Sequence, residues 1–263
     1  MKKWSRYNVP FVSERFGHFL YNTLTNVLIE LDRAHYEQLE RLRSRPREIR
    51  TEADRDFLVL LEKGGVFAEK HEEEKALMVK RYERNAIAFD AGHIGLSICP
   101  TLACNFRCSY CYEPRNNPPV AMSLETMNKI VDFVDSFTTA KKLSVVWYGG
   151  EPTLAFDAVV SLTERLTRLD VEYDNAGMIT NGYLLDEEKI ERLDDLKIKN
   201  VQITIDGDAS IHDRRRFLVD GRPTFDKIMA NVDTLMNSSY EGSCCIRVNI
   251  NKDNMDRYAT LRS

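Results

Sequence analysis

The sequence has no apolar run long enough to cross a lipid bilayer. A membrane helix needs about 20 consecutive apolar residues, and the 263-residue chain contains no such stretch. The opening residues, Met-Lys-Lys-Trp-Ser-Arg, are not followed by the apolar segment that a signal peptide requires. We therefore expect a cytoplasmic protein that has no membrane partner.

An excess of charge of either sign is also missing. The chain carries 37 Lys and Arg residues against 41 Asp and Glu residues, a net charge of −4. Nucleic-acid-binding proteins usually present a basic face, so we expect no nucleic-acid partner. Cysteine is sparse, and six residues in the whole chain are too few for a disulfide-stapled secreted domain. The apolar fraction of 43% is sufficient for a hydrophobic core.

Composition and hydrophobic periodicity divide the chain into three parts. Residues 1–70 contain short strand-like runs and then two amphipathic segments, of which the second begins with Thr51 and Asp54 in a capping-box pattern. This combination predicts a small winged-helix-like α+β domain. Residues 71–92 are rich in Glu, Lys and Arg, which predicts a charged helical linker.

Residues 93–263 alternate strand-like apolar runs with segments of helical periodicity. The expected strands are 94–99, 143–147, 178–179, 201–205 and 245–250. Repeated strand–helix units predict an α/β fold whose sheet is parallel, with right-handed crossovers. Such sheets place their chemistry in the loops at the carboxyl ends of the strands.

Three cysteines, Cys104, Cys108 and Cys111, follow the first of these strands within eight residues. Thiolates are soft ligands that select iron–sulfur clusters, zinc or copper(I). A four-iron cluster held by three cysteines keeps one iron open to another ligand, as a catalytic metal site must. A structural zinc site is the alternative, although such sites usually have four protein ligands and no second cysteine pair repeats the spacing.

The second strand ends at Gly149, Gly150 and Glu151. Consecutive glycines let the backbone approach a ligand closely, and a carboxylate beside them can accept hydrogen bonds from an ammonium group. A tight turn between a strand and a helix is the alternative explanation. We favour the binding function because the cysteine loop is expected at the neighbouring strand end.

Short polar side chains follow the third and fourth strands, namely Thr180 and Asn181, then Thr204 and Asp206. They can bond ribose hydroxyls or a carboxylate, although Asn-Gly and Asp-Gly pairs are also ordinary turn signals. The run 212–216 includes three arginines, whose guanidinium groups match a carboxylate bidentately, or it forms an exposed basic loop.

The sequence leaves the role of one strand residue open and predicts no function for three others. Arg247 lies within the fifth strand, where its side chain either points into the site or reaches out to solvent. Cys99, Cys244 and Cys245 are expected to be small buried apolar residues.

The cysteine loop followed by Gly149–Glu151 resembles the radical S-adenosylmethionine (radical SAM) superfamily. The pattern extends through residues 180–182, 205–207, 212–213 and Arg216, and covers roughly residues 93–250. The fuller pattern is similar to that of peptide maturases and sulfatase-maturing enzymes with a C-terminal SPASM domain. The resemblance implies a partial (β/α)6 TIM-like barrel, because residues 93–263 supply five of six strands and no SPASM domain.

The resemblance implies that the three cysteines bind a 4Fe–4S cluster and that its open iron binds the amino and carboxylate groups of S-adenosylmethionine. The implied contacts to this cofactor come from several loops: Tyr110, Gly149, Gly150, Glu151, Thr180, Asn181, Thr204, Asp206 and Arg216. The implied reaction is reductive cleavage to a 5′-deoxyadenosyl radical, which takes a hydrogen atom from the substrate.

Residues 1–70 resemble the winged-helix recognition element that holds the leader of a ribosomally made precursor peptide, by adding the peptide to a sheet edge. We therefore predict an enzyme that modifies a peptide, for example through a thioether or carbon–carbon crosslink. The resemblance also implies an external electron donor such as flavodoxin or ferredoxin. The alternatives are a formylglycine-forming sulfatase-maturing enzyme, a catalytically incompetent peptide-binding fragment and a zinc-stabilised domain.

Overall fold

The chain divides near residue 90 into two compact units, Met1–Asp90 and Ala91–Ser263. The computed structural model describes residues 2–44, 49–113, 118–252 and 254–255. The division falls within the segment 71–92 that the sequence analysis assigned to a linker. Within the described ranges, no helix is both long and apolar enough to cross a membrane.

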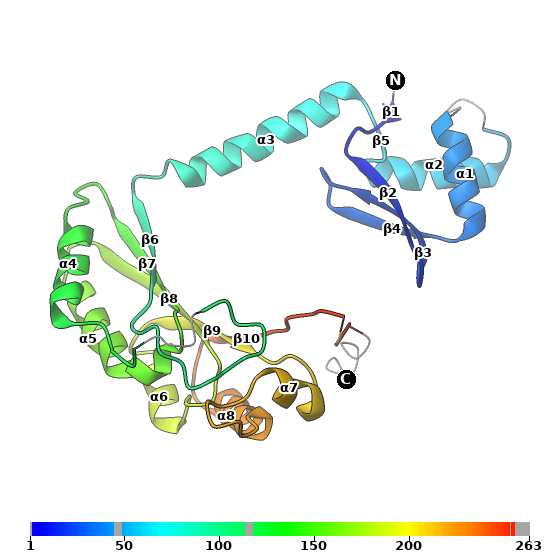
Figure 1. The fold of residues 1–263 in the computed structure, drawn as a ribbon. Helices are drawn as coiled ribbons and strands as arrows, with labels where there is room; N and C mark the ends of the chain where they lie inside the picture. Colours follow the sequence, from blue (N-terminus) through cyan, green and yellow to red (C-terminus); the bar gives the residue numbers. More distant parts are fainter. Residues whose placement is uncertain (1, 45–48, 114–117, 253, 256–263) are drawn as a thin grey trace. The chain divides into compact units, whose positions relative to one another are not determined.

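The first unit is built on a three-stranded antiparallel sheet in the order β2–β3–β4 (Figure 1). Its elements are β1 (Lys3–Trp4), β2 (Asn8–Ser13), β3 (Gly17–Asn22), β4 (Val27–Leu31), α1 (Arg33–Ser44), α2 (Glu52–Lys63) and β5 (Phe67–Ala68). Strand β1 pairs with β5, and leucines of β3, β4, α1 and α2 form the core with Phe57 and Phe67. The unit is a small α+β domain, and its winged-helix character stays a prediction.

A buried carboxylate connects the two helices of this unit. Thr51 Oγ1 accepts a hydrogen bond from the Asp54 backbone at 3.1 Å, and Asp54 accepts one from the Thr51 backbone, which confirms the predicted capping box. Asp54 is fully buried and also accepts bonds from Gln38 and Arg41 of α1. The bond from Gln38 and those from the backbone hold the pKa of this carboxyl well below its usual range.

The charged segment after β5 forms helix α3 (Lys70–Ala88), and none of its residues is buried. A helix without a buried face gains nothing from packing, so its stability comes from its own backbone and from side-chain pairs along it. The pair Lys70–Glu74, one turn apart, is one of these. The predicted helix is confirmed, and its role as a linker stays a prediction.

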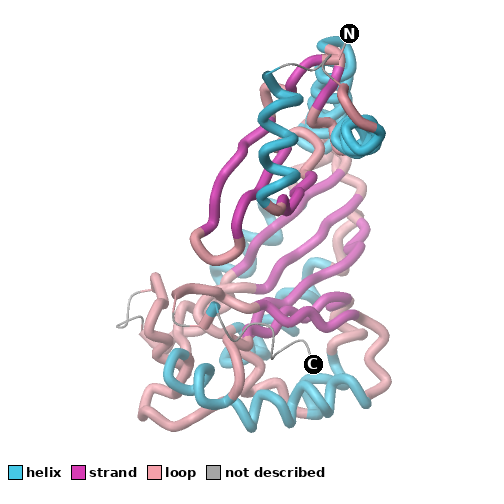
Figure 2. The backbone as a smooth tube through the Cα atoms, turned by 90° about the vertical axis from the view of Figure 1, so that its right-hand side faces the viewer, coloured by secondary structure: helices cyan, strands magenta, loops and turns pink. Residues whose placement is uncertain are grey.

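Five parallel strands form the sheet of the second unit in the order β10–β9–β8–β7–β6, and Figure 2 shows them running side by side. The strands are β6 (His93–Ile98), β7 (Lys142–Trp147), β8 (Glu172–Thr180), β9 (Ile198–Thr204) and β10 (Ser243–Arg247). The helical segments are α4 (Leu124–Asp135), η1 (Pro152–Ala155), α5 (Phe156–Leu166), α6 (Glu187–Arg192), α7 (Ala209–Arg215) and α8 (Phe225–Asn237). A helix between each pair of neighbouring parallel strands is the arrangement of a TIM-like barrel, here a partial one.

The two faces of this sheet differ because successive side chains of a strand point to opposite faces. Leu143, Val145 and Trp147 of β7 are buried in a core that also takes in apolar residues of α4, α5, α6 and α8. The alternate positions carry Ser144 on the other face of β7. The strand register places Arg247 of β10 directly beside Thr204 of β9, so this second face carries polar and charged groups where the strands end.

Strand β8 and the basic run differ in this unit from the sequence-based expectation. Strand β8 begins at Glu172, six residues before the predicted 178–179. Its buried residues Tyr173 and Ala176 are separated by Asp174 and Asn175 at a shift in the strand register, which interrupts the alternation. The basic run contains a short helix, α7, which begins after Asp208. The helix expected from Arg257 onward lies outside the described residues.

The prediction that three cysteines are buried small apolar residues needs correction. Cys99 and Cys244 are partly buried, but Cys245 is exposed. The physical reason is the position of β10, which is the edge strand of the described sheet, with Cys245 in register with Gln202. Side chains on the face turned away from the helices receive no cover there.

Candidate active site

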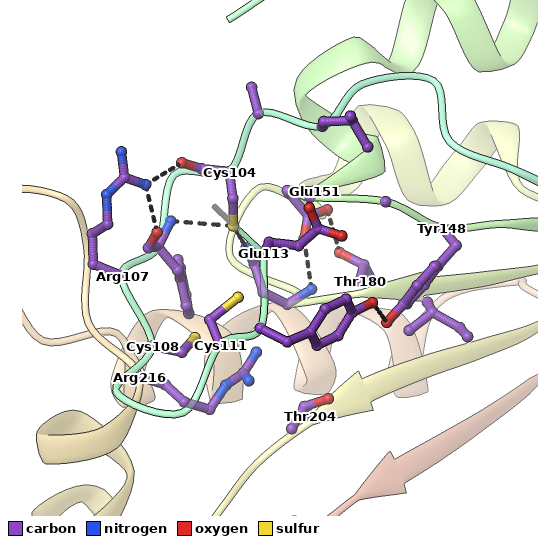
Figure 3. Close-up of a pocket in the computed structure, with 18 of the residues that line it drawn as sticks. Cys104, Arg107, Cys108, Cys111, Glu113, Tyr148, Glu151, Thr180, Thr204 and Arg216 are labelled. Carbon is purple, nitrogen blue, oxygen red and sulfur yellow. Dashed lines mark hydrogen bonds between the residues drawn. The ribbon is translucent and has the colours of Figure 1, made fainter. Parts of the chain in front are cut away.

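A cavity of about 430 Å³ lies at the carboxyl ends of the parallel strands (Figure 3). Its wall is made by the loop after β6, the turn after β7 and the ends of β8, β9 and β10. The sequence-predicted residues that line it are Cys104, Cys108, Tyr110, Cys111, Gly149, Gly150, Glu151, Thr180, Asn181, Thr204 and Arg216. Asp206 does not belong to the lining. The fold thus collects in one place side chains that are up to 112 positions apart in the sequence.

The three cysteine thiols are free, and all three line this cavity. Among the described residues, no group of three or more His, Cys, Asp or Glu side chains converges closely enough to hold a single metal ion. A polynuclear iron–sulfur cluster asks for a different arrangement, because each cysteine binds a separate iron and the thiols surround a volume. The donor set therefore fits a 4Fe–4S cluster better than a preformed zinc site.

Burial makes isolated thiolates costly in this loop. It raises the pKa of Cys104 to about 11 and also raises the pKa of Cys108. Cysteine binds metal as the thiolate, and a bound cation supplies the charge that replaces the proton. A metal cluster would therefore compensate the desolvation of these two sulfur atoms.

Backbone hydrogen bonds join the cysteine loop to the last residue of α7 and to the segment that follows this helix. The backbone of Arg107 donates to the carbonyl of Phe217 at 2.8 Å, and that of Ser109 donates to the carbonyl of Arg215 at 2.9 Å. Phe106 and Leu218 form an antiparallel bridge, and both side chains are buried. These contacts fix the loop in a strand-like conformation, so the cysteine positions depend on residues more than 100 positions later in the chain.

The turn formed by Gly149, Gly150 and Glu151, the glycine turn, packs against the same loop. The Gly150 backbone donates to the carbonyl of Thr101 at 3.2 Å, and the Glu151 backbone donates to that of Ala103 at 2.8 Å. Gly149 has φ +119°, a conformation that a side chain disfavours. The two glycines therefore bring the turn against the cysteine loop, and the binding of a cofactor amino group by these residues stays a prediction.

Glu151 is 1% exposed and accepts four hydrogen bonds from neutral donors. Oε1 accepts from the backbone and the hydroxyl of Thr153, at 3.0 and 2.6 Å, and from the Thr180 hydroxyl at 2.6 Å. Oε2 accepts from the Asn181 backbone at 2.7 Å. The carboxylate thus joins the ends of β7 and β8, while it also borders the cavity.

The structure distinguishes the three consecutive arginines. Arg216 lines the cavity and donates from Nη1 to the Tyr110 hydroxyl at 2.8 Å, while its buried Nε has no hydrogen-bond partner. Arg214 bonds to Ser210 within its own helix. Arg215 forms an ion pair with Asp206, with 3.1 Å between Nε and Oδ2. A cofactor contact is therefore expected of Arg216 alone.

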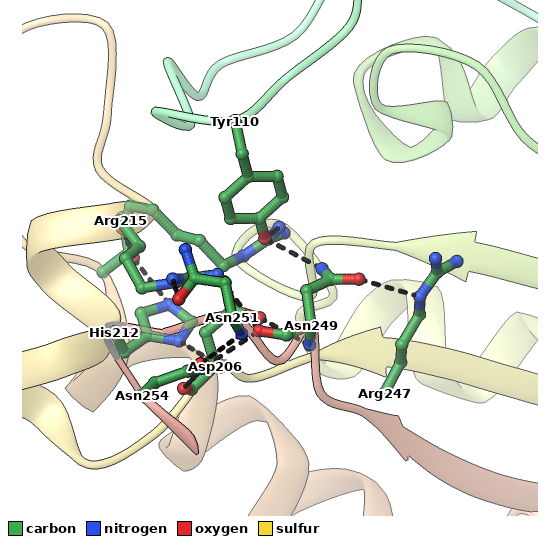
Figure 4. Close-up of polar contacts among 10 residues, drawn as sticks. Tyr110, Asp206, His212, Arg215, Arg247, Asn249, Asn251 and Asn254 are labelled. Carbon is green, nitrogen blue, oxygen red and sulfur yellow. Dashed lines mark hydrogen bonds and ion pairs between the residues drawn. The ribbon is translucent and has the colours of Figure 1, made fainter. Parts of the chain in front are cut away.

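Asp206 lies behind the cavity wall in a network of polar side chains (Figure 4). It is 1% exposed, and its other carboxylate oxygen accepts from the Asn249 backbone at 3.0 Å. Asn249 in turn donates from its side chain to the Tyr110 hydroxyl at 3.0 Å. These bonds let Asp206 support the wall, and its contact with the cofactor stays a prediction.

Several lining residues were not predicted from the sequence. Tyr112 and Tyr148 share a hydrogen bond of 2.8 Å between their hydroxyls, and Asn249 and Arg107 also line the cavity. Tyr148 carries a usable signal, since it stands at a strand end directly before the glycine turn. Asn249 carries none, because its partner Tyr110 is 139 positions away in the sequence.

Comparisons with known proteins agree with this geometry. A family model described as "Radical SAM superfamily" matches residues 98–262. The chain is 27% identical to a GTP 3′,8-cyclase of Mannheimia succiniciproducens over 65% of this chain and 50% of that protein. It is 30% identical to a serine-type anaerobic sulfatase-maturating enzyme of Bacteroides thetaiotaomicron over 56% of this chain and 37% of that protein.

A solved structure, anSMEcpe with bound AdoMet and Kp18Cys peptide, superposes with a TM-score of 0.52 at 25% identity. The superposition covers 61% of this chain and 45% of that chain. This chain spans half or less of the length of the curated relatives named above. With the family model covering residues 98–262, the chain belongs to the radical SAM superfamily, whose enzymes use a 4Fe–4S cluster and S-adenosylmethionine.

Proposed function

We propose that this chain carries the catalytic unit of a radical SAM enzyme that modifies a peptide. The observation that carries the proposal is the cavity at the strand ends, where three free cysteines, the glycine turn and Arg216 meet. A relative that matures sulfatases and a superposed structure that contains a bound peptide support a peptide substrate. A thioether or carbon–carbon crosslink in a ribosomally made precursor is the modification that we infer.

The residues of the chain have distinct parts in this proposal. Cys104, Cys108 and Cys111 would hold the cluster, and Arg216 would bind the carboxylate of S-adenosylmethionine through its guanidinium group. When bound, the cluster and S-adenosylmethionine together supply a 5′-deoxyadenosyl radical that can take hydrogen from an unactivated carbon. Glu151 holds the ends of β7 and β8 together through its bonds to Thr180 and Asn181.

Anaerobic reconstitution of the chain with iron and sulfide tests the proposal. We expect about four iron and four sulfide ions per chain, and 5′-deoxyadenosine after addition of dithionite and S-adenosylmethionine. The matched control replaces Cys104, Cys108 and Cys111 with alanine and leaves Cys99, Cys244 and Cys245 in place. Equal iron content in both proteins would contradict the proposal, and colourless protein with one tightly bound zinc would favour the structural alternative.

We further propose that residues 1–70 bind the leader of the precursor peptide by strand addition. In the described sheet, β4 is an edge strand and its Leu28 is 57% exposed, whereas the opposite edge strand β2 contains Pro10, which has no backbone N–H to donate. Fluorescence anisotropy of labelled leader peptides on the full chain measures this binding. Leu28→Lys should weaken this binding. The control Val59→Lys, at an exposed residue of α2, should leave it unchanged.

A sulfatase-maturing enzyme is the second candidate, favoured by the 30% identity to the Bacteroides enzyme. The two candidates differ in the peptide that they modify. A peptide with a sulfatase-type serine or cysteine that gains formylglycine would favour the second. A serine that becomes formylglycine and a new crosslink both lose 2 Da, so the aldehyde decides between them. A leader-bearing peptide that loses 2 Da, does not react with a hydrazide and shows a crosslink on fragmentation would favour the first.

A further inference from the structure

We propose that Arg247 binds a carboxylate group of the substrate, so that the modified peptide carries an acidic side chain or its free C-terminus close to the reacting residue. This inference rests on the proposed peptide-modifying function, which by itself names no chemical feature of the peptide. It follows from the position, the bonding and the charge of Arg247.

Arg247 is the last residue of β10 and lines the cavity together with Thr204 of β9. The two residues are directly opposite each other in the parallel register, so their side chains share one face of the sheet. This face is the one turned away from the helical core. A substrate bound in the cavity would therefore have Arg247 and the cysteine loop in the same wall.

The guanidinium group of Arg247 is oriented by a single neighbour. Its Nε donates to the side-chain oxygen of Asn249 at 3.2 Å, as Figure 4 shows. Asn249 is itself fixed, because its side-chain nitrogen donates to Tyr110 and its backbone nitrogen donates to Asp206. Within the described part of the chain, the two Nη groups of Arg247 have no partner. They form the pair of parallel donors that binds a carboxylate in a bidentate manner.

The neighbouring acidic groups do not neutralise this charge. Asp206 is paired with Arg215, and Glu151 is enclosed by hydroxyl and backbone donors. Glu113 also lines the cavity, and among the described residues it forms no ion pair with Arg247. The other two arginines of the cavity wall are engaged elsewhere, since Arg107 donates to two backbone carbonyls and Arg216 donates to Tyr110. Within the described residues, Arg247 is thus the cavity arginine whose two Nη groups remain available to a ligand.

Two pairs of small probes test the inference on the full chain after anaerobic reconstitution. The first pair is N-acetyl-glutamate N-methylamide and N-acetyl-glutamine N-methylamide, which differ only in a side-chain carboxylate. The second pair is N-acetyl-glycine and N-acetyl-glycinamide, which differ only in a C-terminal carboxylate. Dissociation constants come from ligand-observed NMR titration. We expect about tenfold tighter binding of the acidic member of one pair, and the pair that shows it identifies the source of the carboxylate.

The variant Arg247→Gln should remove this preference, and Arg247→Lys should retain part of it because a lysine keeps the charge without the planar fork. The matched control is Arg192→Gln, an exposed arginine of α6 outside the cavity lining, which should bind the probes as the unmodified chain does. Equal or undetectable binding of both members of each pair, or a preference that survives Arg247→Gln, overturns the inference.

Two further measurements separate this inference from the proposed function. Iron content is determined first, and an unmodified chain that incorporates no iron contradicts the proposed function itself. A chain that carries the cluster but binds the acidic and neutral probes equally contradicts only the proposed role of Arg247. The dissociation constant of S-adenosylmethionine is measured last. If Arg247→Gln raises this dissociation constant as much as Arg216→Gln does and leaves probe binding unchanged, Arg247 belongs to the cofactor site and the inference fails.

Discussion

A methyl group at Gly150 would lie 2.2 Å from the carbonyl oxygen of Ala103 and 2.5 Å from that of Leu102. Both atoms belong to the backbone of the cysteine loop, which has little room to move because its far side is bonded to residues 215–219. This glycine is therefore required for steric reasons, in addition to any contact that it makes with a cofactor. A side chain here must shift the backbone of Ala103, the residue directly before Cys104.

The variant Gly150→Ala should consequently lose most of its iron after anaerobic reconstitution, by a factor of roughly five or more, since cluster ligation needs all three thiols in place. The control is Gly95→Ala in β6, where the nearest neighbour of the new methyl group would be Ser144 Oγ at 3.7 Å, an ordinary contact. Iron and sulfide assays on both proteins decide the matter. Full iron loading of Gly150→Ala would show that the loop can shift without losing its ligands.

His212 is fully buried, and its hydrogen bonds select one neutral tautomer. Nδ1 accepts from the Asp206 backbone at 3.3 Å, and Nε2 donates to Thr224 Oγ1 at 3.1 Å because that hydroxyl itself donates to the Arg216 carbonyl. Burial, aided by the charge of Arg216, lowers the pKa of His212 to about 4. Protonation would also place two donors against each other at Nδ1.

This shift makes the stability of the second unit depend on pH. Below the ordinary histidine pKa the unfolded chain binds a proton that the folded chain refuses, so the free energy of unfolding falls as the pH decreases from about 6.5 to about 4. Between pH 7 and pH 5 the contribution of His212 is about 2 kcal/mol. His212→Gln should show a pH dependence that is weaker by this amount.

The two tryptophans of the chain make this measurement possible for each unit separately. Trp4 lies in the first unit and Trp147 is fully buried in the second. In a Trp4→Phe background, urea unfolding followed by fluorescence reports only on the second unit. Parallel curves for the parent and His212→Gln across this pH range would contradict the assigned pKa shift.

Among the elements, helix α2 depends most visibly on its first turn. Thr51 and Asp54 cap each other, and Asp54 also bonds to two residues of α1. Thr51→Ala should lower the free energy of unfolding of the first unit by about 1 kcal/mol. Asp54→Ala should lower it further, because Gln38 and Arg41 lose a partner as well. Trp4 fluorescence in a Trp147→Phe background measures both, and equal losses would show that the contacts to α1 add nothing.

The elements also show where sequence patterns have limits. The capping box of α2 is local, so a few adjacent residues determine it, and the structure confirms it. Helix α7 has only seven residues, too few for a helical period, and it was not predicted. Strand β8 was recognised only at its apolar end, because a shift in the strand register at Asp174 and Asn175 interrupts the alternation of its first residues.

At the scale of the whole molecule, the Asp206–Arg215 ion pair connects segments that the sequence keeps far apart. Arg215 bonds to Asn251 at 2.6 Å and to the Asn249 carbonyl at 3.0 Å, and it lies 5.0 Å from the centre of the Tyr110 ring. The pair thus holds together the end of β9, the helix α7, the cysteine loop and the segment after β10. A buried carboxylate that loses its only cationic partner is expensive.

Arg215→Ala should therefore destabilise the second unit by about 3 to 5 kcal/mol. Arg214→Ala should change stability by less than about 0.5 kcal/mol, because Arg214 is exposed and bonds only within its own helix. Urea unfolding followed at Trp147 gives both values. A small effect of Arg215→Ala would mean that water or Asn251 satisfies Asp206 when the arginine is absent.

The sequence by itself determined the superfamily, the alternating strands and helices and the identity of eleven residues of the cavity wall, because the cysteine spacing and the polar residues at strand ends are local patterns. Only the tertiary structure showed that Arg216 and not its two neighbours reaches the cavity, that Asp206 supports the wall from behind, and that Arg247 faces the site with two free donors. The positions of Arg216, Asp206 and Asn249, the partner of Arg247, depend on contacts between residues 9 to 139 positions apart. No local pattern encodes such contacts, since the strand register and the path of each loop settle them only when the chain has folded.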